Sequence, residues 1–187
     1  YQGAVHLNGT TSIASNGGNV VFNGVVDANN NSKTTQMNLT VNAGVGNVTF
    51  NQQVGGAAAD NNNYRNLTAN ADIYNLTVTA ARININADIS TMQEQTYNGA
   101  IIIGDNGSNG VKRTLLSLDP MIHFNGTVDD AVANTHTLIA RAVAVSLTNI
   151  ADNPKVIFER AVGSTSPLYS LEAVVGTQSV LSGAKAG

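Results

Sequence analysis

The sequence predicts an all-β fold, and its composition gives the first evidence for this. Hydrophobic residues make up 42% of the 187 residues, and most of them are Val, Ile, Leu and Ala. Asn, Thr, Ser and Gly supply most of the polarity, whereas charged residues account for only 11%. Because Thr, Val and Ile favour strands while Asn and Gly favour turns, we expect short strands joined by turns.

Alternation of apolar and polar residues marks individual strands. In residues 82–90, apolar side chains occupy every second position, namely Ile83, Ile85, Ala87 and Ile89. This period places them on one face of a strand. Residues 39–43 and 76–80 show the same period, and residues 131–147 form the one stretch with a composition that suits a helix. Clusters of Asn and Gly separate the alternating runs and predict turns; they are residues 16–19, 29–31, 60–63 and 104–107.

A short motif contains all four Phe residues of the chain. It consists of a β-branched residue, any residue, Phe, three further residues and Val, and it recurs at residues 20–26, 48–54, 122–128 and 156–162. Equivalent side chains of stacked repeats line up in columns, and buried aromatic rings favour offset stacking. We therefore expect one stack of rings in a dry core, formed by Phe22, Phe50, Phe124 and Phe158.

A longer repeat lies above this motif. Residues 1–4 (YQGA) match residues 97–100 (YNGA), and the two Phe motifs that follow the first match resemble the two that follow the second. No linker separates the copies. The sequence therefore predicts a single continuous body over residues 1–187, made of two degenerate copies, residues 1–96 and 97–187.

Repeats of short strands are the sequence signature of a solenoid, because one repeat cannot bury its apolar face alone. In a parallel β-helix, each coil stacks on the previous one at a strand spacing of about 4.8 Å. An antiparallel β-sandwich or jelly roll is the alternative. It explains the alternation equally well but gives no reason for the Phe motif, so we favour the parallel β-helix.

Charge and cysteine content exclude several classes of function. Nine basic and twelve acidic residues give a net charge of −3 without a block of either sign. A nucleic-acid binder that depends on a basic face is therefore not expected. The longest apolar run, residues 100–103, is far shorter than the roughly 20 residues of a membrane-spanning helix. The chain contains no Cys, which excludes disulfides and thiolate sites.

Three segments resemble repeats of filamentous haemagglutinin-type bacterial surface exoproteins and adhesins. They are residues 39–50, 95–100 and 123–129, and the resemblance covers most of residues 1–130. It implies a right-handed parallel β-helix, secretion, and a location that is extracellular or at the cell surface. The chain begins with Tyr, so we expect a processed form or a stretch of a longer shaft.

Parallel β-helices also include polysaccharide hydrolases and lyases, and glycoside hydrolysis needs two carboxyl groups that flank the bond. Asp129 and Asp130 form the one adjacent acidic pair in the chain. Neighbours on a strand point to opposite faces, and Asp129 matches Asp27 in the repeat, so we interpret the pair as a solvated turn. No catalytic residue is predicted, and a degenerate β-helix hydrolase or lyase remains an alternative.

No metal site or cofactor is predicted. The three histidines, His6, His123 and His136, are far apart in the sequence and lack the spacing of zinc ligands. Residues 105–110 are similar to the start of a calcium loop, but Leu116 occupies the position where such a loop has Glu. We interpret residues 105–110 as a turn.

Asn-x-Ser/Thr sequons are abundant, and several lie in alternating strands where Asn faces outward. An Asn- and Thr-rich strand protein also generates such triplets by chance. Where they are accessible, they are candidate glycosylation sites. The sequons begin at Asn8, Asn30, Asn38, Asn47, Asn66, Asn75, Asn106 and Asn125.

The sequence therefore predicts a non-enzymatic extracellular structural protein, a rod-like segment of a surface adhesin or of a filament. The open edges of a solenoid need cover, so we expect end-to-end self-association or continuation into a longer solenoid. A carbohydrate-binding surface module, with host or matrix glycans as partners, is a second alternative. Nucleic acid and membrane insertion are not expected.

Overall fold

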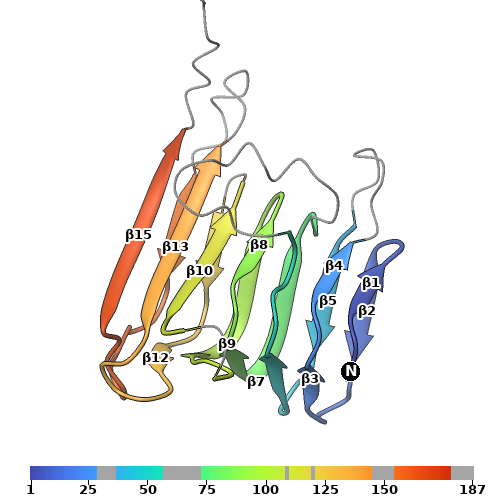
Figure 1. The fold of residues 1–187 in the computed structure, drawn as a ribbon, viewed down its shortest axis with the longest axis horizontal. Helices are drawn as coiled ribbons and strands as arrows, with labels where there is room; N and C mark the ends of the chain where they lie inside the picture. Colours follow the sequence, from blue (N-terminus) through green and yellow to red (C-terminus); the bar gives the residue numbers. More distant parts are fainter. Residues whose placement is uncertain (29–36, 57–72, 108–109, 119–120, 145–153, 178–187) are drawn as a thin grey trace, which may run out of the picture.

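A computed structural model describes residues 1–28, 37–56, 73–107, 110–118, 121–144 and 154–177 (Figure 1). Within these ranges the fold is all-β, and none of the residues forms a helix that could cross a membrane. The strands are β1 (Val5–Leu7), β2 (Thr11–Ala14), β3 (Val20–Phe22), β4 (Val26–Ala28), β5 (Leu39–Asn42), β6 (Asn47–Phe50), β7 (Leu76–Ile85), β8 (Ile89–Thr91), β9 (Gln95–Ile103), β10 (Lys112–Ser117), β11 (Met121–Phe124), β12 (Val128–Asp130), β13 (Thr137–Ala144), β14 (Lys155–Phe158) and β15 (Ser170–Thr177).

The strands pair into three strips, and the chain visits these strips in a fixed order. The first strip contains β1, β4, Val54, β8, β10, β13 and β15. The second contains β2, β5, the first half of β7, the first half of β9, β11 and β14. The third contains β3, β6, the second halves of β7 and β9, β12 and Val162. Each pass of the chain therefore adds one segment to each strip, and Figure 1 shows the strands as a row from β1 to β15.

Every pairing between the described strands is parallel. Antiparallel neighbours need only a short hairpin, whereas parallel neighbours need a long crossover, which here is the rest of each pass. The antiparallel sandwich or jelly roll is therefore wrong for this part of the chain.

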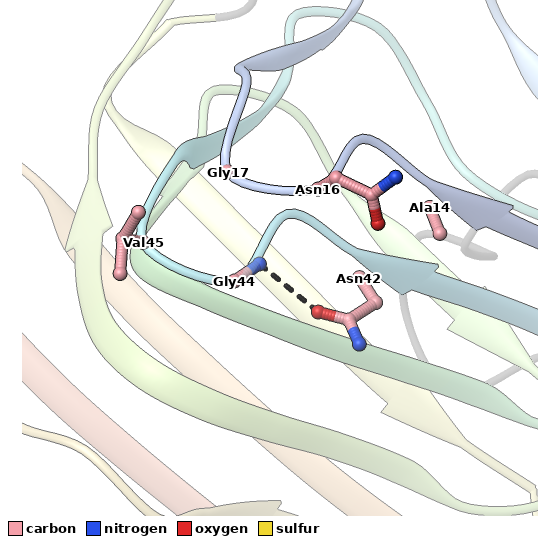
Figure 2. A pocket seen from close by; sticks show the side chains of 6 residues that line it. All are labelled: Ala14, Asn16, Gly17, Asn42, Gly44 and Val45. Carbon is pink, nitrogen blue, oxygen red and sulfur yellow. Dashed lines mark hydrogen bonds between the residues drawn. The ribbon is translucent and has the colours of Figure 1, made fainter.

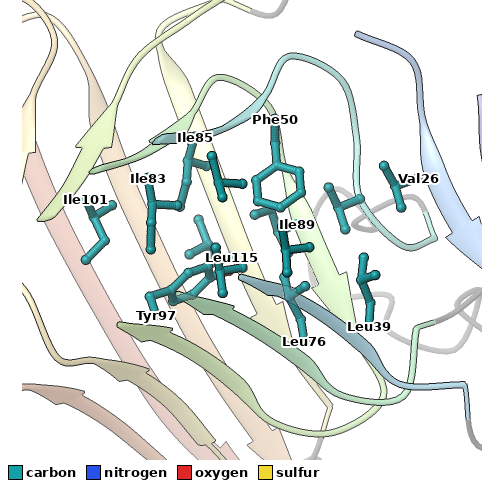
Figure 3. Close-up of a cluster of buried hydrophobic side chains, with 14 of the residues drawn as sticks. Val26, Leu39, Phe50, Leu76, Ile83, Ile85, Ile89, Tyr97, Ile101 and Leu115 are labelled. Atoms are coloured by element: carbon teal, nitrogen blue, oxygen red, sulfur yellow. The ribbon is translucent and has the colours of Figure 1, made fainter. Parts of the chain in front are cut away.

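The core lies on the side of the strips toward which alternate residues point (Figure 3). Ile83, Ile85 and Ile89 are 0% exposed and Ala87 is 2% exposed, so the alternation in residues 82–90 correctly predicted which side chains are buried. Complete burial of an Ile side chain contributes about 1.5–3 kcal/mol. Because the pairing is in register, Ile83 lies beside Val48 and Ile101, and the apolar residues form columns that cross several passes.

The stretch with a composition that suits a helix contains a strand instead. β13 pairs with β10 on one edge and with β15 on the other. Leu138, Ala140 and Ala142 alternate along it and are 0% exposed. The two neighbouring strands decide the conformation, because tertiary context outweighs the weak helix propensity of Ala and Leu.

The four Phe rings form two stacks, so the prediction of a single column is wrong. In the third strip, Phe22 stacks on Phe50 with ring centroids 5.1 Å apart, and Tyr1 stacks on Phe22 at the same distance. In the second strip, Phe124 stacks on Tyr97 at 5.5 Å and on Phe158 at 4.8 Å. One copy of the long repeat does not contain a whole number of passes. The two Phe motifs in residues 97–187 therefore lie in a different strip from the two in residues 1–96.

The paired residues 1–4 and 97–100 have the same structural role in both copies. The backbone N–H of Asn23 donates to the carbonyl of Tyr1, and that of Asn125 donates to the carbonyl of Tyr97, both at 2.9 Å. A Cβ atom on Gly126 would overlap the backbone of Gly99. The Asn-Gly that follows Phe therefore lets two successive passes approach closely in both copies, after β3 in the first and after β11 in the second.

Candidate functional site

The acidic pair that the enzyme alternative depends on is buried, so its interpretation as a solvated turn is wrong. Asp129 is 5% exposed and Asp130 is 3% exposed. Asp129 Oδ1 accepts hydrogen bonds from the backbone N–H groups of Thr165, at 2.9 Å, and Ser166, at 3.1 Å. Asp129 thereby holds the turn of the next pass against the end of β12.

Asp130 binds the loop that leads from β12 to β13. Its Oδ2 accepts from the backbone N–H groups of Thr135 at 2.9 Å and His136 at 2.8 Å, and its Oδ1 accepts from that of Val132 at 3.1 Å. These contacts satisfy a carboxylate that water does not reach. Both aspartates therefore organise backbone rather than face a substrate.

Asp130, His136 and Asp105 form a cluster that joins three segments. His136 Nδ1 lies 2.5 Å from Asp130 Oδ1, and His136 Nε2 lies 2.8 Å from Asp105 Oδ2. The His136 side chain is 2% exposed, that of Asp130 is 0% exposed and that of Asp105 is 36% exposed. Asp105 follows β9 and Asp130 ends β12, which pairs with β9, so the register of these strands brings the carboxylates to the ring.

Hydrogen bonds keep both carboxyl groups ionised. The His136 ring, followed by the N–H of Gly107, lowers the pKa of Asp105. Burial raises the pKa of Asp130, but its hydrogen bonds from His136, Val132 and Thr135 outweigh burial and leave the pKa below the usual value. Each ring nitrogen of His136 faces a carboxylate oxygen, so the ring joins the two carboxyl groups. The cluster can hold charge in place, but it leaves no exposed nucleophile or base besides Asp105.

Sequence reasoning missed this cluster. Asp105 lies 31 residues from His136 in the sequence, and no local pattern pairs the two. Only the pairing register, in which Ile103 lies beside Asp130, reveals that Asp105 comes near. His6 and His123 lie elsewhere, His6 2.5 Å from Asp27 and His123 3.1 Å from Glu159.

The described residues of the segment that is similar to a calcium loop form hydrogen bonds within the chain. Asp105 Oδ1 accepts from the N–H of Gly107 at 2.7 Å, which makes a turn. Arg113 is 0% exposed and donates from Nε to the carbonyl of Gly104 at 2.6 Å and from Nη2 to that of Gly110 at 2.7 Å. Burial lowers the pKa of Arg113, and Asp88 and Asp105 act in the opposite direction. Across the described ranges, no group of three or more His, Asp or Glu residues could hold a metal ion.

A surface hollow of about 330 Å³ lies on another part of the molecule, at the turns that follow β2 and β5 (Figure 2). Within it, Asn42 Oδ1 accepts from the N–H of Gly44 at 2.9 Å. The hollow contains no titratable side chain and hence no acid or base for catalysis. Its lining residues are Ala14, Asn16, Gly17, Asn42, Gly44 and Val45.

Asn side chains form ladders that link successive passes. Asn23 donates to Gln2 at 3.1 Å, Asn51 donates to Asn23 at 2.7 Å, and Asn86 donates to Asn51 at 2.8 Å. Asn23 and Asn51 each donate to the pass before and accept from the pass after, as stacked amides do in other in-register parallel sheets. The ladder thus adds side-chain bonds to the backbone pairing.

Several sequon residues belong to such contacts. Asn75 Nδ2 donates to Asn38 Oδ1 at 3.0 Å, Asn125 Nδ2 donates to Asn98 Oδ1 at 2.6 Å, and Asn106 Nδ2 donates to the carbonyl of Asn51. A glycan would be attached through this nitrogen in place of one of its two hydrogens, and it would have to fit beside the contact. Among the other sequon residues, Asn8 is exposed, Asn38 and Asn47 are half-buried, and Asn30 and Asn66 lie outside the described residues.

The end of the stack formed by β14 and β15 exposes apolar side chains. Tyr169 is 71% exposed, Leu171 43% and Val175 55%. Leu171 and Val175 continue the columns of Leu138 and Ala142, which are fully buried. Comparisons of the chain with family models, with characterised proteins and with solved structures found no match.

Proposed function

We propose that this chain is a segment of a right-handed parallel β-helix that serves as a structural rod and has no enzymatic activity. The observation that carries the proposal is the fixed order of the three strips, to which each pass adds one parallel strand. Such a stack lengthens by about 4.8 Å with each pass while its cross-section stays constant. The number of passes in such a sequence therefore determines the length of the rod, and the continuous strand pairing makes the rod stiff.

The contacts of the acidic residues favour a structural role over the hydrolase or lyase alternative. Glycoside hydrolysis needs two carboxyl groups on either side of a bound sugar. Asp129 accepts from Thr165 and Ser166, and Asp130 accepts from its own loop and faces His136. Neither buried carboxylate is open to a sugar ring.

The place of action follows from the resemblance to filamentous haemagglutinin-type exoproteins. We propose that the chain forms part of the shaft of such a surface adhesin, outside the cell. Columns of buried Ile and Phe, together with Asn ladders, hold the passes together along the shaft. Backbone that is paired on both edges is a poor substrate for proteases, which suits an extracellular rod.

Small-angle X-ray scattering of the purified chain tests the rod directly. We expect a scattering curve that fits a stack of seven passes, about 30–35 Å along the stacking axis, and a far-ultraviolet circular dichroism spectrum dominated by strand. A scattering curve that fits no such stack, or a spectrum without a dominant strand signal, would contradict the proposal. Antibodies against the chain should also label intact, non-permeabilised cells of the source organism, and label that appears only after lysis would contradict the surface role.

A further inference from the structure

The turn that follows β2 contains an Asn-Gly pair in a left-handed conformation. Asn16 has a φ of 51° and Gly17 a φ of 99°. The backbone N–H of Gly18 donates to the carbonyl of Ser15 at 3.1 Å. Positive φ at both central residues is typical of a type I′ turn, in which Asn-Gly is the preferred pair. The shape of this corner therefore explains why the sequence has Asn-Gly here.

The two reactive groups of this pair are both available. Asn16 is exposed, and its side chain projects from the turn (Figure 2). Within the described residues, neither the Asn16 side chain nor the Gly17 N–H has a hydrogen-bond partner. Glycine also lacks a Cβ atom that would hinder its nitrogen near the preceding side chain. The Gly17 nitrogen can therefore reach the Asn16 amide once the turn opens.

Three other Asn-Gly pairs belong to the Asn ladders, which hold their amides in place. Asn23 Nδ2 donates to Gln2 at 3.1 Å. Asn98 Nδ2 donates to Thr79 Oγ1 at 3.2 Å, and Asn125 Nδ2 donates to Asn98 Oδ1 at 2.6 Å. Each of these amides is bonded to the preceding pass, so it turns toward its own glycine only when two passes separate.

Two further pairs differ from Asn16 in other ways. The N–H of Gly107, which follows Asn106, donates to Asp105 Oδ1 at 2.7 Å, and the Asn106 amide donates to a backbone carbonyl. Asn8 is exposed, but it takes part in a contact. Asn8 is therefore the strongest competitor of Asn16, and the pair at Asn109 lies outside the described residues.

We propose that Asn16 is a site of spontaneous deamidation, and that it reacts before the other described Asn-Gly pairs of the folded chain. The Gly17 nitrogen loses its proton and attacks Cγ of Asn16. A nitrogen–carbon bond forms as the bond from Cγ to Nδ2 breaks and ammonia leaves. Water then opens the five-membered succinimide, at Cγ to give aspartate or at the main-chain carbonyl to give isoaspartate.

The rate of this reaction depends on local opening of the turn. Two hydrogen bonds close it, one from the N–H of Gly18 to the carbonyl of Ser15 and one from Ser15 Oγ to the carbonyl of Gly18. A ladder amide reacts only when strands of successive passes separate. Local opening costs less free energy than opening of a paired core. The structure therefore predicts different rates for the same dipeptide.

Both products alter this corner. Aspartate adds a negative charge, and no cationic side chain lines the hollow beside Asn16. Isoaspartate adds one atom to the main chain of the turn. The equivalent turn of the next pass has Gly44, with a φ of 58°, in place of Asn16, and Gly44 has no amide to lose. Deamidation at Asn16 goes beyond the proposed function and does not depend on it, because it requires only the pairing of the passes.

Peptide mapping of the full chain after incubation in mildly alkaline buffer measures the reaction. Water labelled with heavy oxygen marks the residues that hydrolyse during the incubation, and electron-transfer fragmentation distinguishes aspartate from isoaspartate. We expect Asn16 to convert at least tenfold faster than any of the three ladder pairs. Conversion at a ladder pair or at Asn8 that equals or exceeds conversion at Asn16 would overturn the proposal.

The same incubation in urea separates the effect of structure from that of sequence. Because every pair is Asn-Gly, the unfolded chain should convert all of them at rates within about threefold of one another. A preference for Asn16 that persists in urea would assign it to the local sequence and overturn the proposal.

Two variants test the reactive residue and the ladder. Asn16→Gly copies Gly44, so it should preserve the turn and remove the signal at residue 16 alone. Gln2→Ala removes the acceptor of the Asn23 amide and should speed conversion of Asn23 severalfold, whereas Asn125 should not change. An unchanged rate at Asn23 would overturn the protection that we assign to the ladder.

Discussion

β6 and β14 carry the same motif, yet the same side chains differ in burial. Phe50 and Val48 are 0% exposed, whereas Phe158 and Val156 are half-buried. Each ring stacks on the Phe of the preceding motif, and the difference comes from the strand on the other edge. In a stack of this kind, one edge of the motif contacts the preceding Phe motif. The burial of its side chains then depends on the strand that covers the other edge.

Asp27 and Asp129 show that equivalent polar residues of the two copies also differ in their contacts. They match in the repeat, but Asp27 lies 2.5 Å from His6 of the preceding pass, whereas Asp129 accepts from Thr165 and Ser166 of the following pass. The backbone path is repeated, and the side-chain contacts follow whichever loop lies nearby. Equivalence in the repeat therefore does not imply equivalence of function.

The largest expected effect is the difference in stability between the variants Phe50→Ala and Phe158→Ala. Phe50→Ala removes a fully buried ring that stacks on Phe22 and lies beside Ile85, and it should lower the free energy of unfolding by about 3–5 kcal/mol. Phe158→Ala should cost about half as much, because part of its ring already contacts solvent. Urea unfolding of both variants measures the difference, and equal losses would mean that the two edges are covered alike.

His136 and His6 provide the next comparison. Removal of His136 leaves the buried Asp130 carboxylate without one of its hydrogen-bond partners, and we expect His136→Ala to cost about 3 kcal/mol. The side chain of His6 is 59% exposed, and a surface ion pair contributes about 0–1 kcal/mol. Thermal unfolding at neutral pH distinguishes the two variants, and a cost for His6→Ala as large as that for His136→Ala would contradict this account of the cluster.

Gly126 and Gly9 test the close approach of successive passes. A Cβ atom on Gly126 would overlap the backbone of Gly99, whereas one on Gly9 meets nothing within 4 Å. We expect Gly126→Ala to cost about 1–3 kcal/mol and Gly9→Ala to lie within about 0.5 kcal/mol of the wild type. Chemical denaturation of both variants is the measurement, and a neutral Gly126→Ala would mean that the corner can open.

The smallest expected effect is the pH dependence of the stability that the Asp105 carboxylate contributes. Its pKa in the folded chain lies below the usual value of 3.8, so the unfolded chain binds the proton more readily. The stability that Asp105 contributes is complete above pH 3.8 and is lost as the pH falls through the lowered folded value. Asp105→Asn should therefore be less stable than the wild type at neutral pH, by up to about 1 kcal/mol because the group is partly exposed. The difference should shrink in acid, and melting curves across this pH range check the sign.

The sequence predicted strands and burial well because both depend on a period of two residues. The burial of Ile83, Ile85 and Ile89 follows from their spacing alone. The division of the Phe rings into two stacks depends on how many residues one pass contains, and loops of unequal length hide that number. The cluster of Asp105, Asp130 and His136 depends on the register of β9 and β12, which no local pattern encodes.

The order of the three strips also determines where the chain can change in length. The second and third strips are continuous through β7 and through β9, whereas the connections from the first strip to the second range in length from residues 92–94 to residues 55–75. These connections all leave strand ends that are neighbours in the first strip and enter strand starts that are neighbours in the second. Insertions along this corner would leave the columns of the core intact, so a family of such shafts could diversify one side while retaining a common pitch.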